Sequence, residues 1–124
     1  MEKKPVKIRL KSFAHAWNGI RILFDEETNA RIHAVIGAVV LLMGFLLNID
    51  RFEWLAILGT IGLVLITEAV NTAIERLADH VTPERHPHIK VVKDLAAGAV
   101  LISAVIAVLV GIIVFGEKIA GLLI

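Results

Sequence analysis

The chain has 124 residues, of which 57% are hydrophobic, and its formal net charge is +1. This length permits one domain, and the apolar fraction is above that of soluble globular proteins. The near-neutral charge excludes a broad electrostatic attraction to nucleic acid, and the absence of cysteine excludes disulfide bonds and thiolate chemistry.

The N-terminal segment, residues 1–26, carries apolar residues at alternating steps of three and four, flanked by Lys7, Lys11 and Arg21. This spacing predicts an amphipathic helix that lies on the cytoplasmic surface of a membrane. The alternative is a helix packed on a soluble partner, and the basic flanks favour the membrane surface. The apolar positions are Leu10, Phe13, Trp17, Ile20 and Phe24.

Three apolar runs follow a polar segment, residues 25–29, that predicts a turn or a polar helix start. Each run becomes long enough to cross about 30 Å of hydrocarbon when flanking residues are included. The runs predict membrane-spanning helices over residues 30–49, 54–79 and 93–116. Residues 80–92 are predicted to form a loop, because Pro83 and Pro87 cannot continue a helical hydrogen-bond ladder. The alternative, a soluble helical bundle, would need more surface charge than these runs supply.

Lysine and arginine concentrate before the first predicted span and between the second and the third. The positive-inside rule therefore places the N-terminus and the 80–92 loop on the cytoplasmic side of a multi-pass membrane protein. In the third span, small residues four apart allow a neighbouring helix to approach closely and favour self-association. They are Ala99, Ser103, Ala107 and Gly111.

Polar side chains recur every three or four residues where the second predicted span ends. Glu68, Asn71, Glu75 and Asp79 therefore share one stripe of a continuous helix. An ionisable group at membrane depth is costly to desolvate and is a functional-site hypothesis by default. The alternative for Glu68 and Asn71 is a structural hydrogen bond to a neighbouring helix, which four polar residues on a single stripe make less convincing.

Carboxylates, an amide and a lysine at a cytoplasmic membrane edge suit a hard cation together with a polyphosphate. Glu75, supported by Glu27, is predicted to bind Mg²⁺ through its carboxylate oxygens. Lys93 is predicted to face phosphate, with Asp94 orienting it or contacting a nucleotide. Glu68 lies deepest in the apolar region, where a lipid hydroxyl could deliver its proton to a general base.

Other charged residues have simpler interpretations. Arg76 and Arg85 are interpreted as determinants of membrane topology. The histidines are scattered over the surface helix, the start of a span and the loop, which favours interfacial or solvated side chains over a transition-metal site. They are His15, His33, His80, His86 and His88.

Two long motifs carry a resemblance to a known family. The first is Glu68-Ala-Val-Asn71-Thr72-Ala-Ile-Glu75, followed by Asp79, and the second is Lys93-Asp94-Leu-Ala-Ala-Gly98-Ala-Val. Together with the segments at 11–20 and 27–33, they resemble the prokaryotic diacylglycerol kinase family, which also contains the undecaprenol kinases. The resemblance spans nearly the whole chain.

The resemblance implies an all-α integral membrane protein with a surface helix and three transmembrane helices in each subunit of a homotrimer. It implies a bacterial cytoplasmic (inner) membrane location, with the N-terminus and the active site cytoplasmic. The implied reaction is Mg²⁺-assisted transfer of phosphate from ATP to diacylglycerol, giving phosphatidic acid. Undecaprenol is the alternative acceptor, and the residues leave the choice open.

Roles carried over from the family fall into three sets. Glu68 is implied to be the catalytic base, and Glu27 and Glu75 are implied to hold the metal. The implied nucleotide-binding set is Glu27, Glu75, Asn71, Asp79, Glu84, Arg85, His86, Lys93, Asp94 and His15. The implied lipid-binding set is Glu68, Arg9, Trp17, Asn29, Arg31 and Ala97.

A rival hypothesis from another class is a small oligomeric cation channel or transporter whose polar path is lined by the acidic stripe. Such a protein would pass ions across liposomes without consuming ATP. Transfer of labelled phosphate from ATP to an extracted lipid discriminates between the two hypotheses.

Overall fold

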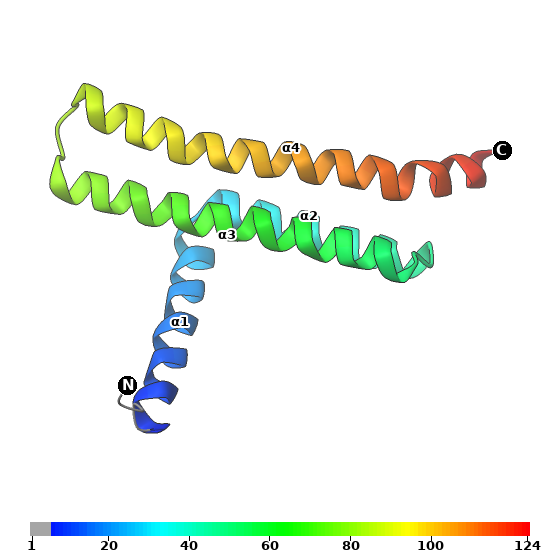
Figure 1. Ribbon diagram of the computed structural model, residues 1–124, viewed down its shortest axis with the longest axis horizontal. Coiled ribbons are helices and arrows are strands. Elements are labelled where there is room, and N and C mark those ends of the chain that lie inside the picture. Colours follow the sequence, from blue (N-terminus) through cyan, green and yellow to red (C-terminus); the bar gives the residue numbers. More distant parts are fainter. Residues whose placement is uncertain (1–5) are drawn as a thin grey trace.

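The computed structural model describes residues 6–124 and consists of four helices, shown in Figure 1. They are α1 (Val6–Glu26), α2 (Thr28–Leu46), α3 (Arg51–Val81) and α4 (Pro87–Leu123). The predicted all-α class is confirmed. Residues 1–5 of the predicted surface helix lie outside the described residues.

Helices α2, α3 and α4 are long and apolar enough to cross a membrane. Large apolar side chains nevertheless point outward along all three, with Phe45 at 75%, Leu101 at 66% and Ile113 at 75% exposure. A single chain in water would not keep so much apolar surface exposed, so these faces fit contact with lipid or with other copies. The prediction of three helices that could span a membrane is confirmed.

The connection between α3 and α4 is shorter than the predicted 80–92 loop. It comprises residues 82–86, because α3 continues to Val81 and α4 begins at Pro87 rather than at residue 93. Proline at the first helical position has its φ already suited to a helix, and the N–H that it lacks would be unpaired there anyway. His86 caps the same helix, since its Nδ1 accepts a hydrogen bond from the His88 backbone N–H at 3.2 Å.

Residues 25–29, predicted to be a turn or a polar helix start, contain the start of α2 at Thr28 and a break that is shorter than a turn. Only Glu27 lies outside both helices, with an extended backbone at φ −103° and ψ 110°. Its N–H still donates to the Leu23 carbonyl at 2.9 Å, and its carbonyl accepts from the Arg31 N–H at 3.2 Å. Because the hydrogen bonding runs on through Glu27, one extended residue is enough to change the direction of the chain.

The turn between α2 and α3 closes α2 with a Schellman motif. Asn48 adopts a left-handed backbone at φ 52°. Its N–H donates to the Phe45 carbonyl at 3.3 Å, and the Ile49 N–H donates to the Gly44 carbonyl at 3.2 Å. Asp50 then caps α3 by accepting from the Glu53 N–H at 2.9 Å, which holds the pKa of the Asp50 carboxyl below its usual range.

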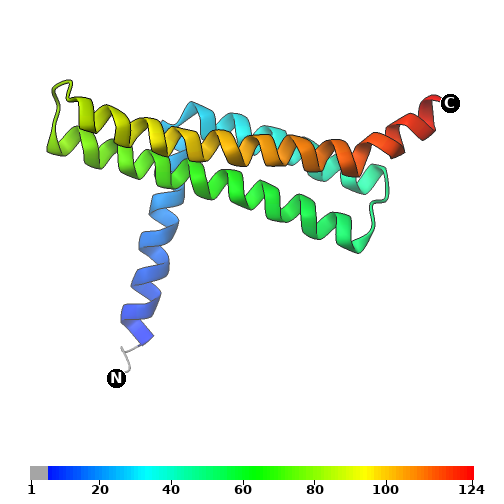
Figure 2. The same cartoon turned by 45° about the horizontal axis from the view of Figure 1, so that its top comes forward.

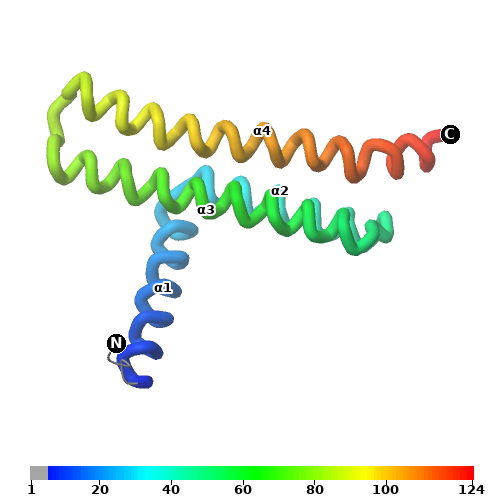
Figure 3. The backbone as a smooth tube through the Cα atoms, viewed as in Figure 1, coloured from blue at the N-terminus to red at the C-terminus, as the bar shows by residue number. Residues whose placement is uncertain are grey.

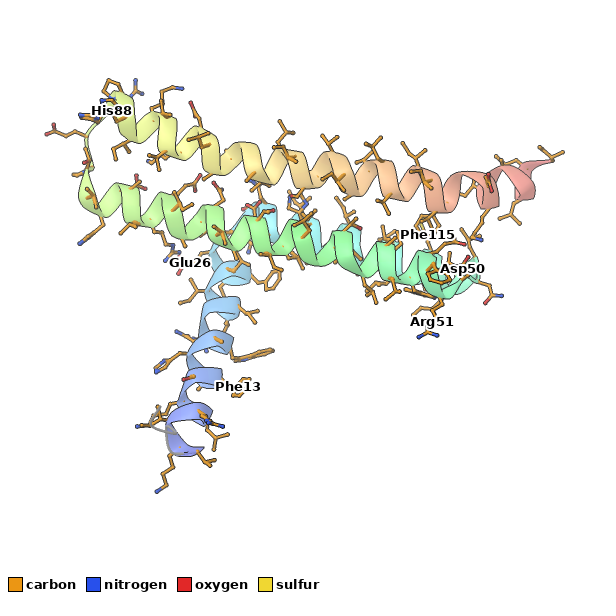
Figure 4. The ribbon with its side chains drawn as sticks, viewed as in Figure 1. Phe13, Glu26, Asp50, Arg51, His88 and Phe115 are labelled. Atoms are coloured by element: carbon orange, nitrogen blue, oxygen red, sulfur yellow. The ribbon has the colours of Figure 1, made fainter. Side chains whose placement is uncertain are left out.

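The core lies at the end of the bundle that contains this turn. Ile49, Ile57, Val114 and Phe115 form its buried centre, and Trp54 packs against them. The Lys118 ammonium lies 3.3 Å from the Glu53 carboxylate, so an ion pair joins α4 to the start of α3. Figure 4 shows Asp50 and Phe115 together at this end.

Helices α3 and α4 pack closely along their length, as the small residues of α4 predict. Ser103 is 2% exposed, and its hydroxyl lies 2.9 Å from that of Thr67 on α3. Gly111 instead faces open space on its exposed side. The small-residue series therefore serves the contact with α3 at Ser103 and leaves the surface at Gly111 uncovered.

Helix α1 stands away from the other three, as Figures 1 and 2 show. Its junction with α2 lies beside the middle of α3 and not at its end, which is clearest in the tube of Figure 3. The cause is length, because α3 has 31 residues and α2 only 19. At 1.5 Å per residue, α3 reaches roughly 18 Å further than α2, so the α3–α4 hairpin extends beyond the junction.

Replacing Gly44 with alanine should destabilise the α2–α3 turn. The added Cβ would lie 2.7 Å from Cη2 of Trp54 and 3.1 Å from Cδ1 of Ile49. The indole ring has little room to withdraw, because its centroid is 4.9 Å from that of Phe45 and it packs on the core. We expect a loss of about 1–3 kcal/mol in the free energy of unfolding, measured by denaturation in detergent micelles.

Gly121→Ala is the matched control, since nothing lies within 4 Å of the Cβ that it would add. Alanine there should be neutral or slightly stabilising through its higher helix propensity. Equal stability of the two variants would contradict the close packing at Gly44.

Candidate active site

Glu68 is the most deeply buried acidic residue of the described chain, at 2% exposure in the middle of α3. Its Oε2 lies 3.9 Å from Nε2 of His33, which projects from the second turn of α2. Glu27 and Glu75 are near enough for their charges to act on the Glu68 carboxyl. A buried carboxyl with one nearby imidazole and two nearby carboxylates is placed to exchange a proton with a bound hydroxyl.

Glu27, Asn71 and Glu75 supply oxygen atoms beside this carboxyl. Asn71 donates from Nδ2 to Oε1 of Glu75 at 3.5 Å, while the buried Oδ1 of Asn71 has no hydrogen-bond partner. Glu27 occupies the N-cap position of α2 without using its side chain as a cap. These uncommitted oxygens, carboxylate and amide, are the ligand types that a hard divalent cation takes.

The cation would still need ligands from elsewhere. Among residues 6–124, no three acidic or histidine side chains gather closely enough to hold an ion by themselves. Mg²⁺ commonly takes one or two carboxylates and completes its shell with water and substrate phosphate. The donor set of Glu27 and Glu75 fits that requirement and does not fit a closed structural metal site.

A pocket of about 690 Å³ opens at the α3–α4 connection. Most of the predicted nucleotide-binding residues line it, namely Asp79, Glu84, Arg85, His86, Lys93 and Asp94. Two ion pairs lie among its lining residues: Lys93 pairs with Asp79 across the two helices, and the Lys90 ammonium lies 2.6 Å from the Asp94 carboxylate along α4. The pocket therefore presents several cationic donors beside carboxylates at the cytoplasm-facing end predicted from the sequence.

The buried carboxyl and the pocket are joined by one stripe of α3. Glu68, Asn71, Glu75 and Asp79 succeed one another at helical spacing, and Asp79 is a pocket residue. From Glu68 to Asp79 the helix rises roughly 16 Å. The pair of Asp79 and Lys93 therefore lies at the pocket end of the stripe, and Glu68 lies at its buried end.

Other predicted site residues are not brought to this stripe within one chain. Arg9, His15 and Trp17 are exposed on α1, which makes no close contact with α4 among the described residues. Figure 4 shows Phe13 of the same helix far from His88 at the α3–α4 connection. Three further predicted lipid-binding residues, Asn29, Arg31 and Ala97, are also exposed.

Two side chains have partners that the sequence reasoning missed. His33 lies beside Glu68, although it was interpreted as an interfacial or solvated histidine. Arg76, interpreted as a topology determinant, forms an ion pair with Glu26. The pairing of Arg76 with Glu26 could have been anticipated, because the predicted metal ligands Glu27 and Glu75 are their sequence neighbours and must lie close together to share an ion.

Comparison with known proteins gives a consistent result. The family model described as prokaryotic diacylglycerol kinase matches residues 14–115. The undecaprenol kinase of Bacillus subtilis is 42% identical over 108 residues, which cover 87% of this chain and 88% of that protein. The diacylglycerol kinase of Synechocystis sp. is 40% identical over 103 residues, covering 82% of this chain and 59% of that one.

A more distant relative agrees with these matches. The diacylglycerol kinase of Escherichia coli is 28% identical over 100 residues, which cover 81% of this chain and 82% of that protein. The matched segment contains the α3 stripe and the pocket residues of α4. The chain therefore belongs to the prokaryotic diacylglycerol kinase family and, as a member of it, is an enzyme of the lipid-kinase class.

Proposed function

We propose that this protein transfers the γ-phosphate of ATP to the hydroxyl of a membrane lipid, with Glu68 as general base. The observation that carries the proposal is the buried carboxyl of Glu68 on the same α3 stripe that reaches Asp79 and the pocket around Lys93. A lipid hydroxyl approaches from the apolar side and a nucleotide from the aqueous side, and α3 is the element that both can reach.

Glu68 acts on the acceptor. As the lipid oxygen bonds to the γ-phosphorus, the bond from that phosphorus to the bridging oxygen of ADP breaks, and Glu68 takes the hydroxyl proton. His33, whose Nε2 is 3.9 Å from Oε2 of Glu68, restrains the position of this carboxylate. Burial of Glu68 also keeps water from competing with the lipid for the phosphoryl group.

Glu27 and Glu75 are proposed to hold Mg²⁺. Support comes from the free side chain of Glu27 at the α1–α2 break and from the unpartnered Oδ1 of Asn71 next to Glu75. When bound, Mg²⁺ neutralises charge on the phosphate oxygens. Asn71, by donating to Oε1 of Glu75 at 3.5 Å, fixes the direction of that carboxylate.

Lys93 is proposed to bind phosphate, with Asp79 holding its side chain between turnovers. Its ammonium is paired with Asp79 and about a third exposed, so it can exchange that partner for a phosphate oxygen. Residues 84–86 border the same pocket and are proposed to contact the rest of the nucleotide. Positioning and charge neutralisation then supply most of the catalysis.

The assembly and location are proposed from the family as well. The protein is proposed to form a homotrimer in the bacterial cytoplasmic membrane, with the N-terminus and the active site facing the cytoplasm. Arg9, His15 and Trp17 on α1, and Asn29, Arg31 and Ala97, are then proposed to reach the active site of a neighbouring subunit. Exposure of all six in one chain supports this proposal.

The acceptor is proposed to be diacylglycerol, the lipid in the names of the family and of the relatives from Synechocystis and Escherichia coli. A second candidate is undecaprenol, which the relative from Bacillus subtilis favours because it is 42% identical and carries the name undecaprenol kinase. Both lipids present one hydroxyl at the interface and long apolar tails to the spans.

Glu68→Gln should retain the fold and nucleotide binding while losing turnover at least about 100-fold, because the amide keeps the shape but cannot take the proton. The measurement is transfer of labelled phosphate from ATP to lipid in mixed micelles, alongside a nucleotide-binding titration. Glu117→Gln, an exposed carboxylate near the end of α4, is the matched control and should keep full activity. Full activity of Glu68→Gln would remove Glu68 from the proposed role.

Lys93→Met should raise the KM for Mg-ATP about tenfold, because one charge-assisted hydrogen bond to phosphate is lost. Initial rates over a range of ATP concentrations at saturating lipid give this value. Lys11→Met, on the exposed face of α1, removes the same charge and should leave the KM for ATP unchanged. A fall in thermal stability with no change in this KM would show that Lys93 serves only its ion pair with Asp79.

The acceptor can be identified by presenting both lipids to the purified protein in identical micelles. We expect labelled phosphatidic acid from diacylglycerol. Phosphorylation of undecaprenol alone would overturn the diacylglycerol assignment and retain the lipid-kinase proposal. Labelling of neither lipid, together with cation flux in liposomes, would favour the channel hypothesis.

A further inference from the structure

One ion pair joins α1 to the rest of the molecule. Arg76 of α3 donates from Nη2 to Oε2 of Glu26, the last residue of α1. Within residues 6–124 it is the only ion pair between α1 and another helix. Figure 4 shows Glu26 at the α1–α2 junction, directed toward α3.

The two partners are the sequence neighbours of the two proposed metal ligands. Glu26 precedes Glu27, and Arg76 follows Glu75. Consecutive Cα atoms are about 3.8 Å apart, so the positions of Glu27 and Glu75 follow those of their neighbours closely. The ion pair between Glu26 and Arg76 therefore limits the distance between the carboxylates of Glu27 and Glu75.

Besides the backbone hydrogen bonds that join Glu27 to Leu23 and Arg31, few contacts hold α1 in place. Leu23 is the only buried residue of α1, and α1 has few contacts with α2 and α3. Glu27 is a single extended residue between two helices, which makes it a pivot. Without the ion pair, α1 could tilt about this residue and change the direction of the Glu27 side chain relative to Glu75.

The pair is poorly suited to a purely stabilising role. The side chains of Arg76 and Glu26 are 50% and 54% exposed. Ion pairs with this exposure contribute little to folding stability, and removal of one partner leaves no buried charge behind. The pair joins the segments that carry the two proposed metal ligands. It can therefore affect the distance between those ligands while contributing little to the folding stability.

We infer that Glu26 and Arg76 are a positioning pair that holds Glu27 within reach of Glu75 and thereby sets the affinity of the protein for its divalent cation. The inference rests on the proposed function, in which Glu27 and Glu75 bind that cation. Neither Glu26 nor Arg76 touches the metal or the nucleotide in this role.

The test is Mn²⁺ binding, measured by electron paramagnetic resonance in detergent micelles with a non-hydrolysable ATP analogue. Glu26→Gln and Arg76→Gln should each weaken Mn²⁺ binding roughly fivefold, the change expected for loss of one exposed ion pair. The Mg²⁺ concentration that gives half-maximal phosphate transfer should rise by the same factor. The thermal unfolding temperature and the KM for lipid should not change.

Asp25→Asn is the matched control for Glu26→Gln. It removes the same charge one residue away, but the Asp25 carboxylate pairs only within α1, 3.9 Å from Arg21. Mn²⁺ binding should therefore stay within about twofold of wild type if the connection to α3 is what matters. The exchanged variant, Glu26→Arg with Arg76→Glu, restores the pair at unchanged net charge and should recover most of the lost affinity.

Equal weakening by Asp25→Asn and Glu26→Gln would overturn the inference, because the effect would then be one of general charge. Failure of the exchanged variant to recover affinity would overturn it too. If wild type bound Mn²⁺ and catalysed transfer while the single variants bound Mn²⁺ as tightly, only the inference would be lost. Absence of Mn²⁺ binding by wild type would instead overturn the proposed metal site, and the inference with it.

Discussion

Helix α3 is longer than a helix needs to be to cross the hydrocarbon layer of a bilayer, and this excess length determines where the polar stripe lies. About 20 helical residues cross a bilayer, and α3 has 31. With its apolar first half in the membrane, its last turns must leave the hydrocarbon. The polar stripe from Glu68 to Asp79 occupies this exit, so one rigid element carries functional groups from an apolar environment to an aqueous one.

The burial of Glu68 has a cost that packing alone would not select. An ionised side chain at the centre of a spanning helix costs about 3 kcal/mol or more, and a leucine of similar size would pack there without it. The chain reduces that cost by placing Glu68 near the end of the apolar stretch, with the imidazole of His33 beside it. In the proposed function, this carboxyl is the group that takes the proton of the lipid hydroxyl.

The sequence predicted most of this arrangement because its main signals are periodic and local. Helical spacing identified the α3 stripe, whereas the pairing of Lys93 with Asp79 was not predicted, because it depends on a connection between α3 and α4 that is shorter than the sequence indicated. The residues at which helices begin and end were harder to predict from the sequence. Pro87 was interpreted as a helix breaker although it begins α4, because proline excludes itself from a helix interior but suits the first position.

Side-chain contacts between helices could not be predicted from local sequence patterns, for a different reason. Contact between Arg76 and Glu26 requires that the chain change direction at one residue, Glu27, and the sequence indicated a broader turn there. The contact between Thr67 and Ser103 was partly accessible, since the small residues of α4 predicted close approach without identifying the residue that meets α3. Periodicity defines the face of a helix, whereas the partner of that face depends on how neighbouring helices are offset along their axes.

Parts of the bundle surface are uncovered in a single chain. A groove of about 340 Å³ runs between α2 and α4 across α3, with His33 at one part of its lining and Gly111 at another. Among residues 6–124 no Cα atom of α2 lies within 8 Å of one of α4, and α3 forms the floor of this groove between them. None of the four α3 stripe residues lines this groove, but His33 lies both in its lining and beside Glu68, so the groove leads to the buried end of the stripe. In the proposed homotrimer a neighbouring subunit would cover this groove. One chain alone therefore carries the proposed reacting groups without enclosing them.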